Sequence, residues 1–272
     1  MGELFLHLDS QTKWIHEVLS QRPRGLFTDI DGTISRIAPT PEAAALLDGV
    51  APLLRQAEAT FDIVAAVTGR AARDAAALVG DDHILYIGNH GFELYQPELG
   101  KRVLAPAALP LVAALESVLD EIGPPLQERW PGLRVEPKGV TASIHLRATS
   151  DPATALEDVY RSVLEHVARA STGLRVTRGR MMVEIRPDLA VDKGTAVSEV
   201  IREHGLRSAL YLGDDRTDLD AFRALRQLAE EGTCQGLSVA VQNDEAVEVA
   251  ADADLVLPSI EDVPDFLRLL LT

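Results

Sequence analysis

Two aspartates separated by one residue follow an apolar run near the start of the chain. The run Gly25-Leu26-Phe27 leads into Asp29-Ile30-Asp31-Gly32-Thr33. Successive side chains of a strand point to opposite faces, so both carboxylates can share a site only where the strand ends and the backbone turns. The carboxyl edge of a parallel strand is where open α/β folds bind ligands. One carboxylate could attack an electrophile while the other moves a proton, although an ordinary Asx-Gly turn would have the same sequence.

A second group of acids stands near the other end of the chain. Leu210-Tyr211-Leu212 runs into Gly213-Asp214-Asp215-Arg216-Thr217-Asp218, and a helical pattern begins at Asp220. Oxygen ligands from two strand ends are typical of a Mg²⁺ site that substrate phosphate completes. Three carboxylates in one loop repel one another unless a cation lies among them. The alternative is that these acids are solvated and cap the following helix.

Two smaller signals lie between the acidic clusters. The run Val64–Val67 ends in Thr68-Gly69-Arg70, where a hydroxyl and a guanidinium suit a phosphate oxygen, although Thr-Gly also simply stops strands. Lys193 opens an amphipathic helix. A lysine there opposes the helix dipole, so a bound anion would explain it, and an exposed surface lysine is the alternative.

Apolar runs alternate with helical patterns over most of the chain. This alternation is typical of a parallel sheet with helices on both faces. We therefore expect a doubly wound, Rossmann-like α/β core. Besides the strands before Asp29, Thr68 and Asp214, we expect strands at 84–88, 237–241 and 253–257 and helices at 12–21, 41–57, 71–79 and 263–271.

The alternation breaks between residues 106 and 187. A helical pattern at 107–122 ends at Pro124-Pro125, and it is followed by runs at 133–136 and 141–146, a helix at 152–170, and runs at 174–177 and 181–185. This order predicts an α+β unit with an antiparallel sheet backed by helices. We expect an inserted cap domain at 106–187 and a core domain formed by 1–105 and 188–272. Caps confer substrate choice by closing over a site and excluding water.

Composition agrees with a soluble enzyme of the cytoplasm. The net charge of −16 over 272 residues argues against nucleic acid or an anionic membrane as a partner. The single cysteine, Cys234, cannot form an internal disulfide, which fits a reducing compartment. The segment Met1–Leu8 lacks the basic residues of a signal peptide, and the apolar runs are too short to span a bilayer.

The ordered set Asp29/Asp31, Thr68, Lys193 and Asp214/Asp215 resembles the four motifs of the haloacid dehalogenase superfamily of phosphatases. The resemblance implies that Asp29 attacks phosphorus and that Asp31 serves as general acid and then general base. It implies that Thr68 and Lys193 stabilise the transferring phosphoryl group. It also implies a Mg²⁺ cofactor, whose ligand set comprises the Asp29 carboxylate, the Asp31 backbone carbonyl, Asp214 and the neighbouring Asp215.

Polar residues of the expected cap contain the clue to the substrate. Lys138, His145 and Arg147 surround an expected hairpin, where His145 and Arg147 share one strand face by their period of two, and Glu184 interrupts an apolar strand. On one sheet face these groups could bind sugar hydroxyls, and the alternative is ordinary alternation with polar residues facing water.

This cap resembles that of trehalose-6-phosphate phosphatases, in which a Lys-Gly-x-Ser-x-x-x-His-Tyr-Arg segment and a Glu-x-Lys/Arg-Pro segment bind the sugar. Here Thr141 replaces the serine and Leu146 the tyrosine. The run Gly88–Glu93 is similar to the family's Gly-x-His-Gly element. The resemblance implies that the substrate, a small phosphorylated disaccharide, is bound by Arg70, His90, Lys138, Thr141, His145, Arg147 and Glu184.

We therefore expect a Mg²⁺-dependent hydrolase of trehalose 6-phosphate. Three alternatives stay open: a related capped phosphatase acting on sucrose phosphate, a glucosylglycerol phosphate or mannosyl-phosphoglycerate; a phosphotransferase that passes the phosphoryl group to a sugar; and a non-catalytic sugar-phosphate sensor. A substrate bearing a carboxylate would need more cations than Lys138 and Arg147. A sensor would not need the nucleophile Asp29.

Overall fold

The computed structural model describes residues 11–38, 40, 43–170, 172–179, 181–243 and 247–272. The segment Met1–Leu8 lies outside the described residues. The chain forms two compact units, one of Met1–Val103 with Val191–Thr272 and the other of Leu104–Ala190. In the part of the chain that the structure describes, no helix has the length and apolar character needed to cross a membrane.

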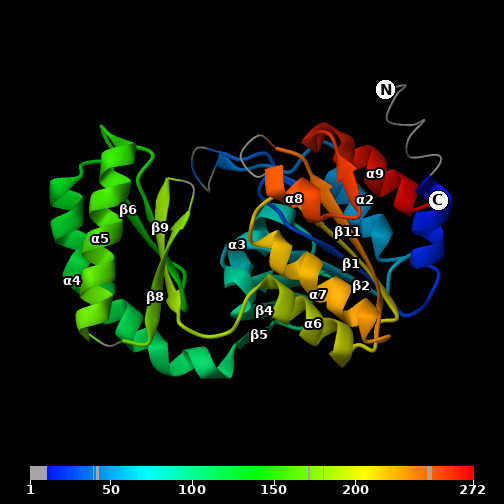
Figure 1. Cartoon of the computed structure of the whole chain (residues 1–272), viewed down its shortest axis with the longest axis horizontal. Coiled ribbons are helices and arrows are strands. Elements are labelled where there is room, and N and C mark those ends of the chain that lie inside the picture. Colours follow the sequence, from blue (N-terminus) through cyan, green and yellow to red (C-terminus); the bar gives the residue numbers. More distant parts are fainter. Residues whose placement is uncertain (1–10, 39, 41–42, 171, 180, 244–246) are drawn as a thin grey trace. The chain divides into compact units, whose positions relative to one another are not determined.

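The larger unit is built on an eight-stranded sheet of order β12-β11-β10-β1-β2-β3-β4-β5 (Figure 1). Each of the pairs that join β12 through to β3 is parallel, whereas β4 pairs antiparallel with β3. The strands are β1 (Arg24–Thr28), β2 (Ile63–Val67), β3 (Leu85–Gly88), β4 (Glu93–Gln96), β5 (Lys101–Leu104), β10 (Ser208–Gly213), β11 (Gln235–Val241) and β12 (Leu255–Leu257).

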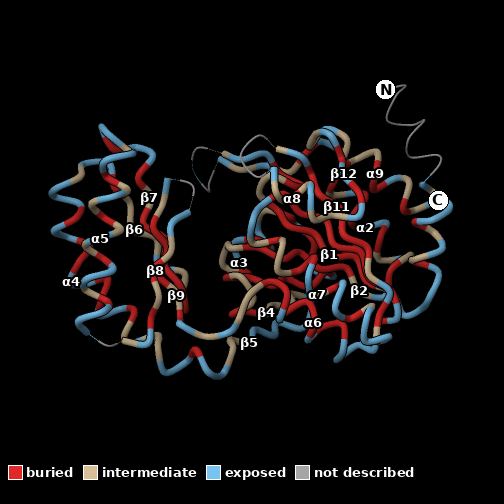
Figure 2. The backbone as a smooth tube through the Cα atoms, viewed as in Figure 1, coloured by how far each residue is buried: buried red, intermediate tan, exposed pale blue. Residues whose placement is uncertain are grey.

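Helices cover both faces of this sheet, which confirms the expected α/β class. Leu26 of β1 lies in one hydrophobic core with the helices α2 (Val50–Ala57) and α9 (Val263–Leu270), and its neighbour Phe27 lies in the other with α6 (Lys193–Glu203) and α7 (Asp218–Glu230). The central strands are therefore buried along most of their length (Figure 2). Besides the helical residues 11–18, the helices of this unit are α2 (Val50–Ala57), α3 (Ala72–Val79), α6 (Lys193–Glu203), α7 (Asp218–Glu230), α8 (Val247–Asp252) and α9 (Val263–Leu270), with 3₁₀ turns η2 (Asn89–Gly91) and η4 (Ile260–Asp262).

Two local expectations for this unit were incomplete. The helix expected at 41–57 begins only at Val50, because Gly49 takes a left-handed φ of 83° and Leu46 bridges to Ser35. Residues 41–42 lie outside the described part. Strands β4 and β5 were not expected, because they are only partly buried and carry little apolar alternation.

The smaller unit contains a four-stranded antiparallel sheet of order β6-β7-β9-β8. Its strands are β6 (Arg134–Pro137), β7 (Ala142–His145), β8 (Leu174–Gly179) and β9 (Met182–Pro187), and η3 (Pro106–Leu111) precedes its helices α4 (Val112–Arg129) and α5 (Pro152–Ala170). Both helices pack on one face of the sheet (Figure 1). The expected break at Pro124-Pro125 was wrong: α4 continues to Arg129, since Ile122 and Leu126 extend its buried stripe into the core.

Candidate active site

Asp29 is the first residue after β1 and lies at the carboxyl edge of the parallel strands. Its backbone N–H donates to the carbonyl of Leu212 at 2.8 Å, so the residue continues the pairing with β10 while its side chain enters the loop region. Asp29 is only 4% exposed. The side chain of Asp31, two residues further on, is 34% exposed. The two carboxylates therefore occupy different environments, as different roles would require.

Asp29 shares Lys193 with the acidic loop that follows β10. The Nζ atom of Lys193 lies 2.9 Å from Oδ1 of Asp29 and 2.7 Å from Oδ1 of Asp218, and the lysine is 2% exposed. Lys193 is thus buried between two carboxylates, and the exposed-lysine alternative is wrong. The positive end of the helix dipole at the start of α6 disfavours a cation, and this pair of anions offsets that unfavourable effect.

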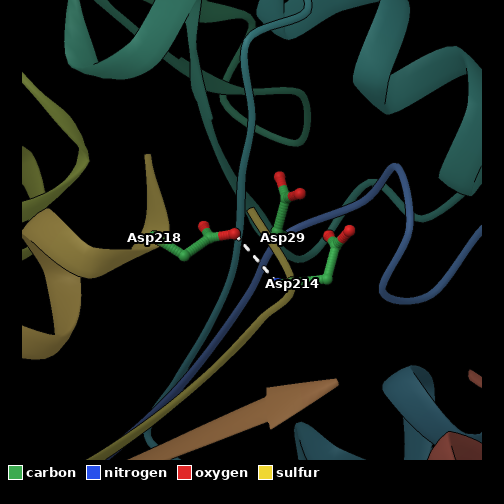
Figure 3. A group of neighbouring side chains, drawn as sticks. All are labelled: Asp29, Asp214 and Asp218. Carbon is green, nitrogen blue, oxygen red and sulfur yellow. Dashed lines mark hydrogen bonds between the residues drawn. The ribbon is translucent and has the colours of Figure 1, made fainter. Parts of the chain in front are cut away.

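Asp218 is saturated with hydrogen bonds from the protein itself. Its Oδ1 accepts from Lys193 and from the hydroxyl of Tyr211 at 2.7 Å each. Its Oδ2 accepts from the backbone N–H groups of Asp214 and Asp215 at 3.0 and 2.9 Å. Four donors fill the acceptor positions of one carboxylate. Asp218 therefore shapes the loop and holds Lys193, and the dashed bond to Asp214 can be followed in Figure 3.

The buried charges of this cluster do not cancel. Burial, followed by the neighbouring carboxylates, raises the pKa of Asp29 well above its usual value, against the opposing effect of Lys193. Burial and then Asp218 raise the pKa of Asp214 to about 7. Burial alone would lower the pKa of Lys193, but Asp218 and Asp29 outweigh it and raise that pKa. Three carboxylates face one ammonium, so a divalent cation would neutralise the excess charge.

Asp29, Asp214 and Asp218 each offer one carboxylate oxygen within 4.8 Å of the others, so the group could hold a metal ion. Because Asp218 is already saturated, Asp29 and Asp214 are the carboxylates that fit a cation best. Asp215 was also expected to be a metal ligand. It is exposed, and its Oδ1 accepts from the N–H of Thr217 at 3.1 Å. A ligand role for Asp215 and for the Asp31 carbonyl stays a prediction.

Sequence reasoning missed the residues that orient Asp214. The hydroxyl of Thr33 donates to its Oδ1 at 2.9 Å, and Nδ2 of Asn243 donates to its Oδ2 at 3.0 Å. Gly32 makes this approach possible, since a Cβ there would lie 2.1 Å from the Asp214 carboxylate and φ is +94°. The available signal for Asn243 was its position two residues after the end of the buried strand β11.

Thr68 and Arg70 lie in the loop after β2, which neighbours β1. Thr68 is 1% exposed, and its Oγ1 accepts from the backbone N–H of Arg70 at 3.2 Å. The guanidinium of Arg70 grips Asp31 through two bonds of 2.6 and 2.7 Å. A planar fork of this kind fixes a carboxylate in one orientation. Arg70 thus holds the second aspartate here, and its contact with substrate stays a prediction.

His90 belongs to the left-handed turn η2 beside the same loop. Its N–H donates to the carbonyl of Thr68 at 3.0 Å. A Cβ on residue 69 would lie 2.6 Å from the His90 ring, so the ring packs directly on Gly69. His90 is therefore fixed against the loop that carries Thr68 and Arg70.

Within the smaller unit, His145 and Glu184 share the sheet face opposite the helices. In the pairing of β7 with β9, Glu184 lies opposite Ser143. Ser143 is two residues from His145 along β7, so the side chains of His145 and Glu184 point to the same face. Nε2 of His145 lies 2.5 Å from a carboxylate oxygen of Glu136. Lys138 and Thr141 form the hairpin turn through a backbone bond of 2.8 Å.

The remaining predicted cap residue, Arg147, differs from expectation. The strand β7 ends at His145, so Arg147 lies exposed in the following turn rather than on the strand face.

Comparison with known proteins matches residues 27–260 to the trehalose-phosphatase family. The chain is 36% identical to a trehalose-phosphate phosphatase of Mycobacterium avium over 258 residues, which is 91% of this chain and 62% of that one. It is 32% identical to trehalose-phosphate phosphatase B of Arabidopsis thaliana over 74% of this chain and 56% of that one. It is also 37% identical to an uncharacterized glycosyl hydrolase of Mycobacterium tuberculosis over 81% of this chain, but spans only 16% of that protein.

Solved structures agree on the fold. The C-terminal domain of the C. albicans trehalose-6-phosphate phosphatase superposes with a TM-score of 0.78 at 22% identity, covering 96% of each chain. A trehalose-6-phosphate phosphatase related protein gives 0.73 at 24% identity, covering 91% of this chain and 96% of that one. At these identities the likeness shows the fold alone. The family match over most of the sequence, together with the relatives above, shows that this chain belongs to the trehalose-phosphate phosphatase family.

Proposed function

We propose that the protein hydrolyses trehalose 6-phosphate to trehalose and phosphate through an aspartyl-phosphate intermediate, as the final step of trehalose synthesis. The observation that carries the proposal is the buried cluster in which Lys193 joins Asp29 to the loop of Asp214. A carboxylate at a strand end, beside one buried cation and a partner carboxylate suited to a metal, is arranged for attack on a phosphate ester.

The proposed reaction assigns one chemical role to Asp29 and another to Asp31. A carboxylate oxygen of Asp29 bonds to phosphorus as the bond from phosphorus to the sugar oxygen breaks, and Asp31 gives that oxygen a proton. Water then attacks phosphorus, Asp31 takes its proton, and phosphate leaves Asp29. Because Arg70 grips Asp31 in this structure, proton transfer requires the carboxylate to leave the guanidinium. Lys193 and Thr68 would stabilise the phosphoryl oxygens.

A Mg²⁺ ion bound by Asp29 and Asp214 would supply positive charge to the transferring phosphoryl group. Lys193 would neutralise part of the negative charge of the same phosphoryl group, so the metal ion and the lysine would both stabilise it. The relevant cofactor is therefore a hard divalent cation with oxygen ligands.

We assign substrate choice to the cap, with residues 106–187 inserted between the core segments 1–105 and 188–272. The shared face of His145 and Glu184 offers an imidazole and a carboxylate to sugar hydroxyls. Lys138, Thr141 and Arg147 would complete the grip on the glucose unit remote from the phosphate.

Phosphate release from a panel of sugar phosphates tests the proposal, with wild type and Asp29→Asn assayed in Mg²⁺ and after chelation. We expect strong preference for trehalose 6-phosphate and a loss of roughly 10⁴-fold or more in the variant, because no other group replaces the nucleophile. Asp81→Asn is the matched control, since Asp81 is also 4% exposed but follows α3 at the other end of the strands.

The outcomes separate the alternatives. Preference for another sugar phosphate would keep the mechanism and overturn the substrate assignment. Transfer to an added sugar in place of phosphate release would indicate a phosphotransferase. Tight binding without turnover would identify a sensor.

A further inference from the structure

A buried carboxylate that the mechanism does not use lies behind the active-site loops. The side chain of Glu93 is fully buried, and its Oε2 accepts from Nδ2 of Asn89 at 2.8 Å and from the N–H of Ala72 at 3.1 Å. Its Oε1 accepts from Nε of Arg102. Ala72 is the first residue of α3, so the carboxylate also lies at a favourable helix N-terminus.

Glu93 thereby holds a turn with unusual backbone geometry. Asn89, His90 and Gly91 have φ values of 51°, 55° and 103°, all in the left-handed region. Non-glycine residues persist there only where the surroundings determine them. The side-chain bond from Asn89 to Glu93 and the backbone bond from Asn89 N–H to the Arg70 carbonyl, at 2.8 Å, supply that constraint.

The turn touches two separate parts of the proposed catalytic machinery. On one side, His90 bonds the carbonyl of Thr68 and packs on Gly69. On the other side, a Cβ on Gly91 would lie 2.6 Å from the carbonyl of Asp192, the residue that caps α6 directly before Lys193. The turn is therefore wedged between the Thr68 loop and the Lys193 helix.

We propose that Glu93 is a positioning residue that fixes the spacing of Thr68, His90 and Lys193 through the Asn89–Gly91 turn. Glu93 lies behind the turn and acts only through it. The inference rests on the proposed phosphatase activity for its kinetic readout, whereas the state of the turn can be measured without any substrate.

The test is Glu93→Gln, which keeps the side-chain shape but replaces one acceptor oxygen by a donor. We expect kcat to fall by about 10- to 100-fold with KM changed less than threefold, as for small misplacements of reacting groups. When Glu93→Gln is added to His90→Ala, kcat should fall by a further factor of less than about two. The effects of substitutions at residues that act through one another are not additive. Hydrogen exchange of the Asn89 and His90 amides should accelerate at least tenfold.

Asp81→Asn is again the matched control, because it makes the same acid-to-amide change in a buried side chain, and it should leave kcat and the exchange of the turn unchanged. If Glu93→Gln does not fold, Asn89→Gly serves instead, since glycine accepts the positive φ and removes the side-chain bond to Glu93.

A kcat within twofold of wild type, or losses that multiply with those of His90→Ala, would overturn the proposal. If the wild-type protein releases phosphate from no sugar phosphate, the proposed function fails by itself. Hydrogen exchange of the turn amides then tests whether Glu93 holds the turn. Unchanged exchange in both Glu93→Gln and Asn89→Gly would overturn that role.

Discussion

Single residues hold both carboxylate oxygens of Asp214. Thr33 and Asn243 donate to its two carboxylate oxygens, and each of these bonds leaves further lone pairs for a cation. Partners of this kind are part of a metal site, because they fix the orientation of the ligand. The neighbouring Asp218 illustrates the opposite case, in which protein donors take up the whole carboxylate.

Thr33→Val should weaken the response to Mg²⁺. Removing the hydroxyl that orients Asp214 should raise the half-saturating Mg²⁺ concentration by about 10-fold, with kcat at saturation changed less. Metal titrations of phosphate release measure the effect. Ser238→Ala removes another buried hydroxyl, which bonds Asp254, and should not shift the titration. An unchanged titration in Thr33→Val would show that Asp214 needs no such support.

The contact of Glu136 with His145 gives a pH-dependent contribution to stability. The hydrogen bond from His145 lowers the pKa of Glu136 below its usual value, against the effect of burial. A carboxylate whose folded pKa is lowered stabilises the fold above its unfolded pKa of 4.5 and loses that contribution as pH falls.

Glu136→Gln should therefore lower the free energy of unfolding by about 1 kcal/mol at pH 7 and by much less at pH 3. Urea denaturation at the two pH values measures this difference. A deficit of equal size at both pH values would contradict the assigned cause.

At the scale of elements, α6 is built to deliver Lys193. Asp192 caps the helix and forms a reciprocal capping box with Thr195, so the first turn is fixed although a cation opens it. Gly194 lets the helix approach α7, because a Cβ there would lie 2.2 Å from the carbonyl of Asp220. The close approach of the two helix starts brings Lys193 within reach of Asp218.

Gly194→Ala should destabilise the protein although alanine is the better helix former. Propensity alone would raise the free energy of unfolding by about 1 kcal/mol. Because the added methyl meets backbone, we expect a net decrease of about 1–3 kcal/mol together with reduced kcat. Gly123→Ala in α4 is the matched control, since its nearest atom would be 3.8 Å away, and its stability should be unchanged or slightly higher. Equal effects of the two substitutions in urea denaturation would refute the packing argument.

At the scale of the whole molecule, the residues proposed for the chemistry and those proposed to bind the sugar lie in different units. The larger unit carries Asp29, Lys193 and Asp214, and the smaller unit carries the polar sheet face with its own hydrophobic core. The net charge of −16 disfavours a phosphorylated substrate in general, so the local cations Lys193 and Arg70 must act against the overall field.

Glu184→Gln should therefore separate recognition from chemistry. Loss of a hydrogen bond to a charged group should raise KM for trehalose 6-phosphate about 10-fold or more. Hydrolysis of 4-nitrophenyl phosphate, which has no sugar, should stay within twofold of wild type. Glu157→Gln removes an exposed carboxylate of the same unit, which pairs with Arg178. This substitution should change the hydrolysis of neither substrate. Equal losses on both substrates in Glu184→Gln would place Glu184 in the chemistry instead.

Much of this organisation follows from the sequence because its causes are local. Apolar runs that end in polar residues predicted β1, β2 and β10, and the carboxyl ends of parallel strands necessarily meet at one edge. The change in pattern after residue 105 likewise predicted the antiparallel sheet of the smaller unit, with two strands after each of the helices α4 and α5. Strands β4 and β5 could not be predicted because they are only partly buried and carry little apolar alternation. The start of α2 could not be predicted because the left-handed φ of Gly49 and the bridge from Leu46 to Ser35, rather than periodicity, determine it.

The sequence by itself determined the residue types, the order of the elements and the strand ends at which Asp29, Thr68 and Asp214 stand. Only the tertiary structure decided which atoms meet: Lys193 with Asp29 and Asp218, Arg70 with Asp31, Thr33 and Asn243 with Asp214, and Glu93 with Asn89. The physical reason is that strand and helix patterns depend on neighbours along the chain. Hydrogen bonds between loops depend instead on sub-ångström placement, which the packing of the whole unit sets.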